Sequence, residues 1–369
     1  MSRAKLILFT PGPVRTPPVV NDFLADPPVN YHRQDGFRTM FAATERDVKS
    51  LVGIKDAAAY FATMIVSTGT GAVEACLEAL APLGKGLLVR NGFFGARWVD
   101  QATQKGLAHV VLDGSDQAPV DVARLEAALD ADRSIKWVFF VAHETRAGLV
   151  NPMVAIGKAC KQRGVMVGCD AISAAYAYPI DIEASEVDLT VTSSAKAIQA
   201  VAGLGIVFVK LASLPALAAH KRPSQYFDLV AETEKQKKGH ETRFAQPVHL
   251  HAALRAACDH LGELGIDKHF ARIQRQMKTI HDHLARLGVA AQLDPAFRSN
   301  VAVNFRLPPG LEYPEFAQRM EAEGFYLLYG IPGDMTHFQI STIGDLTDEH
   351  VAGICRAFDK VLGRARAAA

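Results

Sequence analysis

The sequence has few of the features that mark disulfide-rich or metal-binding proteins. The cysteines in its 369 residues are odd in number, scattered and free of CxxC spacing. They are Cys76, Cys160, Cys169, Cys258 and Cys355. This pattern is not that of a disulfide framework or a cysteine metal site, so we expect reduced thiols, no bound metal and a cytoplasmic location.

An excess of charge of one sign is also missing. The 40 lysines and arginines balance 39 aspartates and glutamates, which leaves a net charge of +1. We therefore expect neither nucleic acid nor an anionic membrane as a partner. No apolar run reaches the roughly 18 residues of a membrane span. The TPGP segment breaks the short apolar patch near the start without a small-residue cleavage site, so we expect no signal peptide.

What the sequence does contain is an alternation of short apolar runs and amphipathic helical stretches over its first two-thirds. Strands are predicted at 61–66, 86–90, 108–113, 136–142, 165–169, 187–192 and 204–210. Helices are predicted between them at 71–82, 94–105, 122–130 and 153–164. Continuous apolar strands separated by helices indicate an α/β fold, with a mainly parallel central sheet covered by helices on both faces.

The pattern changes after about Ser213. Residues 232–243 are charged and lack periodicity, which indicates a solvated loop. Two long helices and then a mixture of short strands and helices follow, which is typical of a smaller α+β domain. A chain of this length exceeds a typical single domain. We predict a large domain at 1–262, with residues 1–19 able to pack on the small domain, and a small domain at 263–369.

Three segments carry the chemistry. The first, residues 67–71, reads Ser-Thr-Gly-Thr-Gly and lies between a predicted strand and a predicted helix. Glycines let a backbone approach a phosphate, hydroxyls donate hydrogen bonds, and a helix N-terminus attracts an anion. The segment matches neither the dinucleotide nor the Walker A pattern. An ordinary helix cap remains the alternative.

The second segment is centred on Asp170, which closes the predicted strand at 165–169. The carboxyl end of a central parallel strand is where α/β proteins place ligands. A carboxylate there could pair with a protonated ring nitrogen of a cofactor. The alternative is an aspartate that caps a helix N-terminus.

The third segment, residues 193–196, ends in Lys196 and precedes the apolar run 198–210. A lysine among small and apolar residues has little exposed surface around it. Burial lowers the pKa of an amine toward the neutral nucleophile that a Schiff base requires. The alternative is a lysine whose amine reaches solvent.

Together these segments resemble a known family, the class V aminotransferases of PLP fold type I, and in particular the 2-aminoethylphosphonate–pyruvate transaminases and their alanine–glyoxylate relatives. The resemblance runs nearly end to end through the segments TPGP, STGTGAVEA, NGFFGARW, HETRAGLVNP, VGCDAISA, SSAKAIQAVAGLG, RFAQPVH and FQISTIGD. It implies a homodimer with shared active sites. It also implies transfer of an amino group from a small amine or amino acid to a 2-oxo acid such as pyruvate or glyoxylate.

The resemblance also implies a role for individual residues. Lys196 would be the catalytic residue and would hold pyridoxal 5′-phosphate (PLP) as a Schiff base, while Asp170 would pair with the ring nitrogen. The other implied cofactor contacts are Thr68, Gly69, Thr70 and Ser194 at the phosphate, Phe94 and Ile172 near the ring faces, Thr145 at the phenolic oxygen, and Arg243 toward the neighbouring subunit's site.

Two positions depart from the family pattern. Gln339 stands where the family carries an arginine that clamps the substrate's acid group, and Ala245 stands where it carries a threonine. We hypothesise that Arg146, His32 or Arg33 supplies the missing positive charge. A surface or interface role for Arg146 is the alternative.

The sequence leaves three functions open. The resemblance favours a transaminase, whereas loss of the clamping arginine leaves room for a lyase of the same fold. A catalytically silent PLP-fold binding protein is the third alternative. Retention of Lys196, Asp170 and the 67–71 turn argues against it, because a silent scaffold has no use for a buried lysine.

Overall fold

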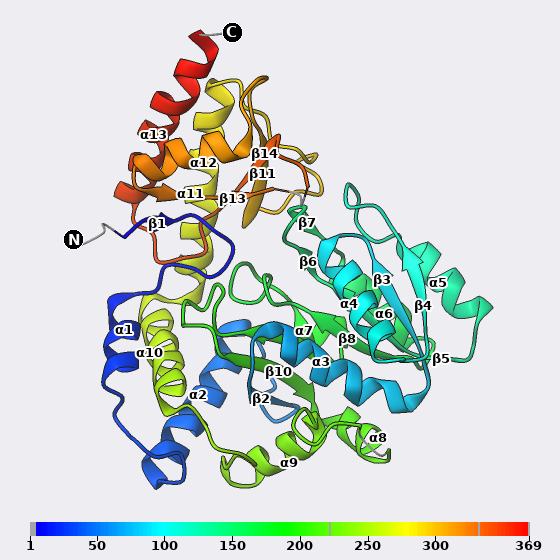
Figure 1. The fold of residues 1–369 in the computed structure, drawn as a ribbon. Helices are drawn as coiled ribbons and strands as arrows, with labels where there is room; N and C mark the ends of the chain where they lie inside the picture. The colour runs from blue at the N-terminus through cyan, green and yellow to red at the C-terminus, as the bar shows by residue number, and fades with distance from the viewer. Residues whose placement is uncertain (1–4, 221–222, 331–332, 368–369) are drawn as a thin grey trace.

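The computed structural model describes residues 5–220, 223–330 and 333–367, and a seven-stranded sheet lies at its centre (Figure 1). The strands in spatial order are β2 (Tyr60–Val66), β10 (Leu204–Lys210), β9 (Leu189–Ser193), β8 (Met166–Asp170), β5 (Ile135–Val141), β3 (Lys85–Arg90) and β4 (His109–Asp113). β10 runs antiparallel to both of its neighbours, and the remaining pairs are parallel. The prediction of a mainly parallel sheet is confirmed.

Helices cover both faces of this sheet, as predicted, because each face is apolar. One face packs against α1 (Pro18–Ala25), α2 (Asp35–Val52), α5 (Val122–Ala131), α6 (Met153–Lys161), α7 (Ile182–Ser185) and α10 (Val248–Leu264). The other packs against α3 (Gly69–Leu80), α4 (Phe93–Gln104), α8 (Leu214–Ala218) and α9 (Leu229–Gly239). The sequence analysis had assigned no element to α1 or α2. A short hairpin, β6 (His143–Glu144) and β7 (Leu149–Val150), follows β5.

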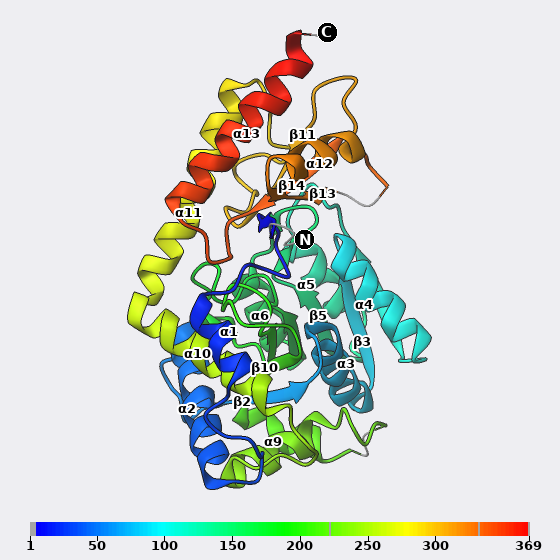
Figure 2. The same ribbon diagram turned by 60° about the vertical axis from the view of Figure 1, so that its left-hand side comes forward.

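The second half of the chain ends in a separate layer, which lies above the large sheet in Figures 1 and 2. Its antiparallel sheet has the order β11 (Ala302–Arg306), β14 (His337–Ser341) and β13 (Leu328–Tyr329). The amino-terminal β1 (Ile7–Leu8) pairs with β12 (Phe325–Tyr326) in the same region. Its helices are α11 (Ile266–Arg286), α12 (Tyr313–Ala322) and α13 (Asp348–Ala367). The layer has its own apolar cluster; the exact boundary near residue 262 stays a prediction.

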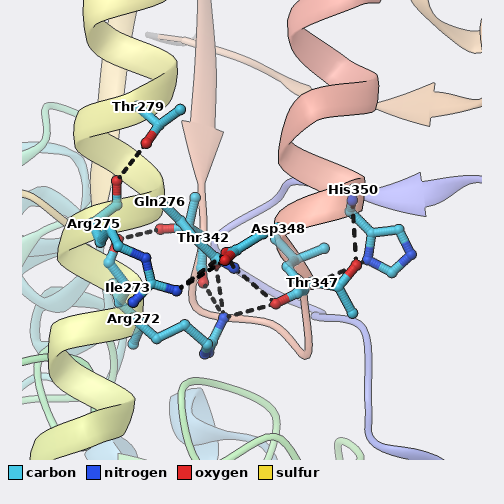
Figure 3. Close-up of polar contacts among 10 residues, drawn as sticks. Arg272, Ile273, Arg275, Gln276, Thr279, Thr342, Thr347, Asp348 and His350 are labelled. Atoms are coloured by element: carbon cyan, nitrogen blue, oxygen red, sulfur yellow. Dashed lines mark hydrogen bonds and ion pairs between the residues drawn. The ribbon is translucent and has the colours of Figure 1, made fainter.

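Polar side chains of α11 fix the loop that joins β14 to α13 (Figure 3). The guanidinium of Arg272 donates to the carbonyl oxygens of Thr342 and Leu346, both at 3.4 Å. Gln276 donates to the same Leu346 oxygen at 2.8 Å, and Arg275 pairs with Asp348 at 3.1 Å. Burial lowers the pKa of Arg272 to about 10. The loop is therefore held by bonds to its backbone.

The prediction of a solvated loop at 232–243 was wrong, because helix α9 covers Leu229–Gly239. Asp228 caps this helix by accepting from the backbone N–H of Ala231. After Leu229 and Val230 its buried side chains are polar: Gln236 bonds both the N–H and the carbonyl of Met64, and Thr233 bonds Thr63. A hydrophobic pattern cannot reveal a helix that packs through hydrogen bonds. Among the described helices none combines the length and hydropathy that a membrane crossing requires.

One buried carboxylate ties the amino-terminal ends of β8 and β9 to the surrounding chain. Asp188 is 1% exposed and accepts from Lys161 Nζ at 2.6 Å, from the backbone N–H of Val167 at 2.7 Å and from the Ser213 hydroxyl. Removing it would leave a half-buried ammonium and a buried N–H without their partner.

Asp188→Ala should therefore lower the free energy of unfolding by about 3 to 5 kcal/mol, the range for breaking a buried ion pair by removal of one partner. The matched control is Asp130→Ala, which removes a more exposed carboxylate from Arg163 and should cost about 1 kcal/mol or less. Urea denaturation at one protein concentration measures both. Equal losses for the two variants would contradict this role for Asp188.

Candidate active site

A cavity of about 250 Å³ opens at the carboxyl ends of β5, β8 and β9. Its walls come from the N-termini of α3 and α4, from the segments that follow these three strands, and from the Gly12–Pro13 turn. Side chains from distant parts of the sequence meet here because the carboxyl ends of parallel strands share one edge of the sheet.

Lys196 lies three residues beyond β9, and its partly buried side chain lines this cavity. Nζ donates to the carbonyl oxygen of Pro11 at 2.9 Å. Burial lowers the pKa of Lys196 to about 8, and the charge of Asp170 opposes this shift. Gly12 adopts φ +145°, and a Cβ there would lie 2.5 Å from Nζ. Only glycine lets the TPGP turn approach the amine this closely.

Asp170 closes β8, and both of its carboxylate oxygens accept hydrogen bonds. Oδ1 accepts from the backbone N–H of Ile172 at 2.9 Å, and Oδ2 accepts from Trp98 Nε1 at 3.0 Å. Burial raises the pKa of Asp170 to about 6, against the effect of these two donors and of the Lys196 charge. The carboxylate is thus held in one orientation and remains ionised above about pH 6.

The 67–71 turn leads into α3, and its Ser67 hydroxyl donates to the carbonyl oxygen of Thr68 at 2.9 Å. Thr68 takes the N-cap position in an extended conformation, yet its side chain makes no capping hydrogen bond. A Cβ on Gly69 would lie 2.6 Å from Ile172 Cδ1, so a larger residue would crowd the cavity wall. The turn therefore offers free N–H groups and a hydroxyl at a helix N-terminus, the arrangement that binds an anion.

Glu144, which the sequence analysis missed, sets the start of α4. Its buried carboxylate accepts from the backbone N–H groups of Phe94 at 3.0 Å and Gly95 at 2.6 Å. Burial raises the pKa of Glu144 to about 7 in spite of these two bonds. Because Phe94 lines the cavity, Glu144 fixes the position of its ring. An acidic residue directly before Thr145 in the HETRAG segment was the available signal.

Thr145 lies beside Ser173 at the cavity wall. Their hydroxyl oxygens lie within hydrogen-bond distance of each other and of the carbonyl oxygen of His143, so one hydroxyl donates to its neighbour while the other donates to that carbonyl. Nδ1 of His143 is 3.1 Å from the Ser173 carbonyl oxygen. Burial lowers the pKa of His143 to about 4, so the imidazole is neutral. The hydroxyl pair is thus fixed between two strand ends.

The structure brings most of the predicted residues together. The cavity is lined by Thr68, Gly69, Thr70, Phe94, Thr145, Arg146, Asp170, Ile172 and Lys196. Five others do not line it: Ser194, Arg243, Gln339, His32 and Arg33. Ser194 donates to the Val201 carbonyl oxygen, whereas the adjacent Ser193 faces the cavity. The roles of all these residues in binding stay predictions. Within the described ranges no cluster of metal-ligating side chains is present.

Trp98 is the second residue that the sequence analysis missed. It lies one helical turn after Phe94 on α4, and the two ring centroids are 6.5 Å apart. The same helix therefore presents one aromatic ring to the cavity and one N–H to Asp170.

Comparison with known proteins gives one consistent result. The family model described as aminotransferase class-V matches residues 23–327. The chain is 32% identical to the 2-aminoethylphosphonate–pyruvate transaminase of Burkholderia pseudomallei over 96% of each chain. It is also 32% identical to the transaminase of that name from Paraburkholderia phymatum, over 97% of this chain and 96% of the relative.

Solved structures show the same fold. An alanine–glyoxylate aminotransferase from Nostoc sp. superposes with a TM-score of 0.90 at 21% identity and covers 98% of this chain and 96% of its own. A pyridoxamine–pyruvate aminotransferase from Mesorhizobium loti superposes with a TM-score of 0.87 at 19% identity, over 99% of this chain and 93% of its own.

The raised pKa of Glu144 predicts a pH-dependent contribution to stability. The folded protein holds a proton that the unfolded chain releases between the ordinary pKa of 4.5 and about 7. This contribution is therefore complete below the unfolded value and is lost as the pH rises through the folded value. Glu144→Gln, which does not titrate, should gain stability relative to the parent protein between about pH 5 and about pH 8, by up to about 3 kcal/mol.

Denaturant midpoints of the two proteins, measured in parallel at both pH values, give this difference directly. Titration of all other groups cancels in the comparison. A difference that does not change with pH would show that Glu144 keeps an ordinary pKa.

Proposed function

This chain belongs to the class V aminotransferases, which are PLP enzymes, and from that premise we propose that it transfers an amino group from a small amine or amino acid to a 2-oxo acid such as pyruvate or glyoxylate. The observation that carries the proposal is the meeting of Lys196, Asp170 and the α3 N-terminus in one cavity. The relatives named for transfer to pyruvate and glyoxylate support these acceptors.

The residues present fit PLP. An anion-binding helix N-terminus, a buried carboxylate and a buried amine line the same cavity, and Gly12 and Gly69 keep its walls open. Thr68, Gly69 and Thr70 would hold the phosphate and Asp170 the ring nitrogen. Phe94 and Ile172 would lie against the ring, and Thr145 would bond the phenolic oxygen. When bound, the cofactor supplies an electrophilic aldehyde and an electron-withdrawing ring, which acidify the carbon that carries the substrate's amine.

Lys196 supplies the proton transfer. With a pKa of about 8, its amine is neutral in a far larger share of molecules near neutral pH than that of an ordinary lysine. A neutral Nζ can accept the proton from the amine-bearing carbon and return it later. Asp170, which is mostly ionised at neutral pH, would stabilise a proton on the ring nitrogen of the bound cofactor.

Dependence on an acceptor separates this function from a lyase of the same fold. A panel of amine donors assayed with pyruvate, with glyoxylate and with no acceptor tests it. Product that forms without any 2-oxo acid would favour elimination, whereas strict dependence supports amino transfer.

The assembly that we propose is a cytoplasmic homodimer with shared active sites. Arg243, His32 and Arg33 lie outside the cavity of their own chain, and a shared site would give them a neighbouring cavity to reach. The five cysteines are buried and unpaired, which suits a reducing compartment. Sedimentation equilibrium of the purified protein tests the dimer.

Lys196→Ala should lower kcat by at least about a thousandfold, because it removes both the covalent attachment and the proton carrier. Borohydride treatment in the presence of PLP should label position 196 of the parent protein and leave the variant unlabelled, as read by peptide mass spectrometry. Lys136→Ala, which changes an exposed lysine, is the control and should keep both properties. Full turnover by the Lys196 variant would refute the proposal.

Trp98→Phe should raise the pKa of Asp170, because it removes the donor to Oδ2. A hydrogen bond to a charged group contributes about 1.5 kcal/mol, which corresponds to about one pKa unit. The acidic limb of the kcat/KM profile should therefore move up by about one unit. Trp137→Phe is the matched control, since its N–H bonds the Gly84 carbonyl oxygen instead. A Trp98 variant with an unshifted profile would mean that this bond does not govern Asp170.

A further inference from the structure

Two arginines border the cavity without an acidic partner. Arg146 and Arg97 both line it, and within the described ranges neither forms an ion pair with a carboxylate. Both charges act on the buried Lys196 amine and help to lower its pKa. Asp170 lines the same cavity and offsets part of this charge, but the two arginines and Lys196 outnumber it, which favours an anionic ligand.

The guanidinium of Arg146 is oriented by neutral groups only. It donates to the carbonyl oxygens of Tyr329 at 3.1 Å and Gly330 at 3.3 Å, and to the Tyr329 hydroxyl at 3.1 Å. Its central carbon lies 4.4 Å from the Tyr329 ring centroid and 5.6 Å from that of Phe93. Three of the five N–H groups of the guanidinium are thus used, which leaves two for a ligand.

Arg97 shares one of these rings. Its guanidinium carbon is 5.0 Å from the centroids of both Phe93 and Phe94. Both guanidiniums therefore lie against the Phe93 ring, and both residues line the same cavity. Stacking on an aromatic face orients a guanidinium and leaves its edge free for hydrogen bonds.

The backbone that carries Arg146 is held by two amide side chains of the small sheet. Gln339 Nε2 donates to the Thr145 carbonyl oxygen at 2.6 Å and to Asn304 Oδ1 at 2.9 Å. Asn304 Nδ2 donates to the Arg146 carbonyl oxygen at 2.6 Å. Asn304 and Gln339 face each other across β11 and β14. This pair, the Asn304–Gln339 clamp, fixes the loop from two neighbouring strands.

Gln339 itself is poorly suited to bind an acid. It is fully buried and does not line the cavity, and both hydrogens of its amide nitrogen are occupied by protein oxygens. The atom left without a partner within the described residues is Oε1. That atom is an acceptor, which would repel a carboxylate or phosphonate.

We propose that Arg146, with Arg97, binds the acid group of the amino donor or acceptor, and that Gln339 is a positioning residue that acts through Arg146. The inference rests on the proposed function and specifies its substrates as molecules that carry a carboxylate or a phosphonate. An adjoining cavity of about 410 Å³ also borders Arg146 but is lined by Asp113 and Asp116. The acid group therefore lies on the inner side, away from these carboxylates.

Calorimetric titration of the PLP-loaded enzyme with propionate and with ethylphosphonate tests the proposal, because neither compound has an amine and neither can react. Arg146→Gln should weaken binding of the preferred acid by about 10- to 100-fold, and Arg146→Lys by less, since lysine keeps the charge but loses the planar fork. Arg97→Gln should weaken ethylphosphonate more than propionate, because the phosphonate carries the larger charge. Unchanged affinities in Arg146→Gln would overturn the proposal.

Two further variants isolate the positioning role. Gln339→Met keeps the length of the side chain and removes its donor, so it should weaken acid binding several-fold and raise KM with little change in kcat. The same substitution in an Arg146→Gln background should have no further effect on acid affinity, whereas additive losses would show that Gln339 acts independently of Arg146. Arg133→Gln, at an exposed arginine that lies between α5 and β5 and does not line the cavity, is the control for lost charge.

These measurements separate the inference from the proposed function. If acid binding depends on Arg146 but the enzyme transfers no amino group, the anion site is supported and the proposed aminotransferase activity is refuted. If the enzyme transfers amino groups but its affinity for the acids does not change in the Arg146 variants, the aminotransferase activity is supported and the anion site is refuted.

Discussion

Burial of one amine and one carboxylate in the same cavity imposes the main constraint on this structure. Desolvation disfavours both charges and moves the pKa of Lys196 down to about 8 and that of Asp170 up to about 6. Each charge stabilises the other across the cavity, and neither group could be left there alone without a large cost. At physiological pH the carboxylate of Asp170 is therefore mostly ionised, and a minority of the Lys196 amines are neutral, a far larger share than for an ordinary lysine. This is the condition that amino transfer requires of the protein.

A small number of strands and helices place Asp170 and Lys196 in the same cavity. β8 and β9 end side by side and deliver Asp170 and the Lys196 segment to one edge of the sheet. Helix α4 adds Phe94 to the cavity wall and the Trp98 N–H to Asp170, and Glu144 fixes the helix start from the next strand. The small sheet reaches the same cavity through the Asn304–Gln339 clamp. Large and small layers thus meet at the segment that carries the cavity-lining residues Thr145 and Arg146.

Much of this could be predicted from the sequence, for definite physical reasons. Continuous apolar strands separated by amphipathic helices fixed the α/β class, because hydrophobic periodicity reports which faces are buried. Lys196, Asp170 and the 67–71 turn were identifiable because each combines an unusual residue type with the end of a predicted strand. The family resemblance then supplied the cofactor, and the comparisons confirmed the family.

Other features of the structure could not be predicted, because no local sequence pattern indicates them. Helix α9 buries Thr233 and Gln236 through hydrogen bonds, so its pattern looked like that of a loop. The bond from Trp98 to Asp170 joins positions 72 apart, and the bond from Gln339 to Thr145 joins positions 194 apart. Contacts of this range follow from the assembled fold, and a single sequence contains no period or motif that encodes them.

One contact at the base of the small layer has a mechanical consequence. The side-chain amide of Gln199, three residues after Lys196, donates to the carbonyl oxygen of Ile343 at 2.9 Å, in the loop that Arg272 and Gln276 hold. A tilt of the small sheet would therefore displace the segment that carries Lys196 through this bond, and the loop that carries Arg146 through the Asn304–Gln339 clamp. The two loops are therefore linked, so a rotation of the small sheet that moved the Arg146 loop would also displace the Lys196 segment.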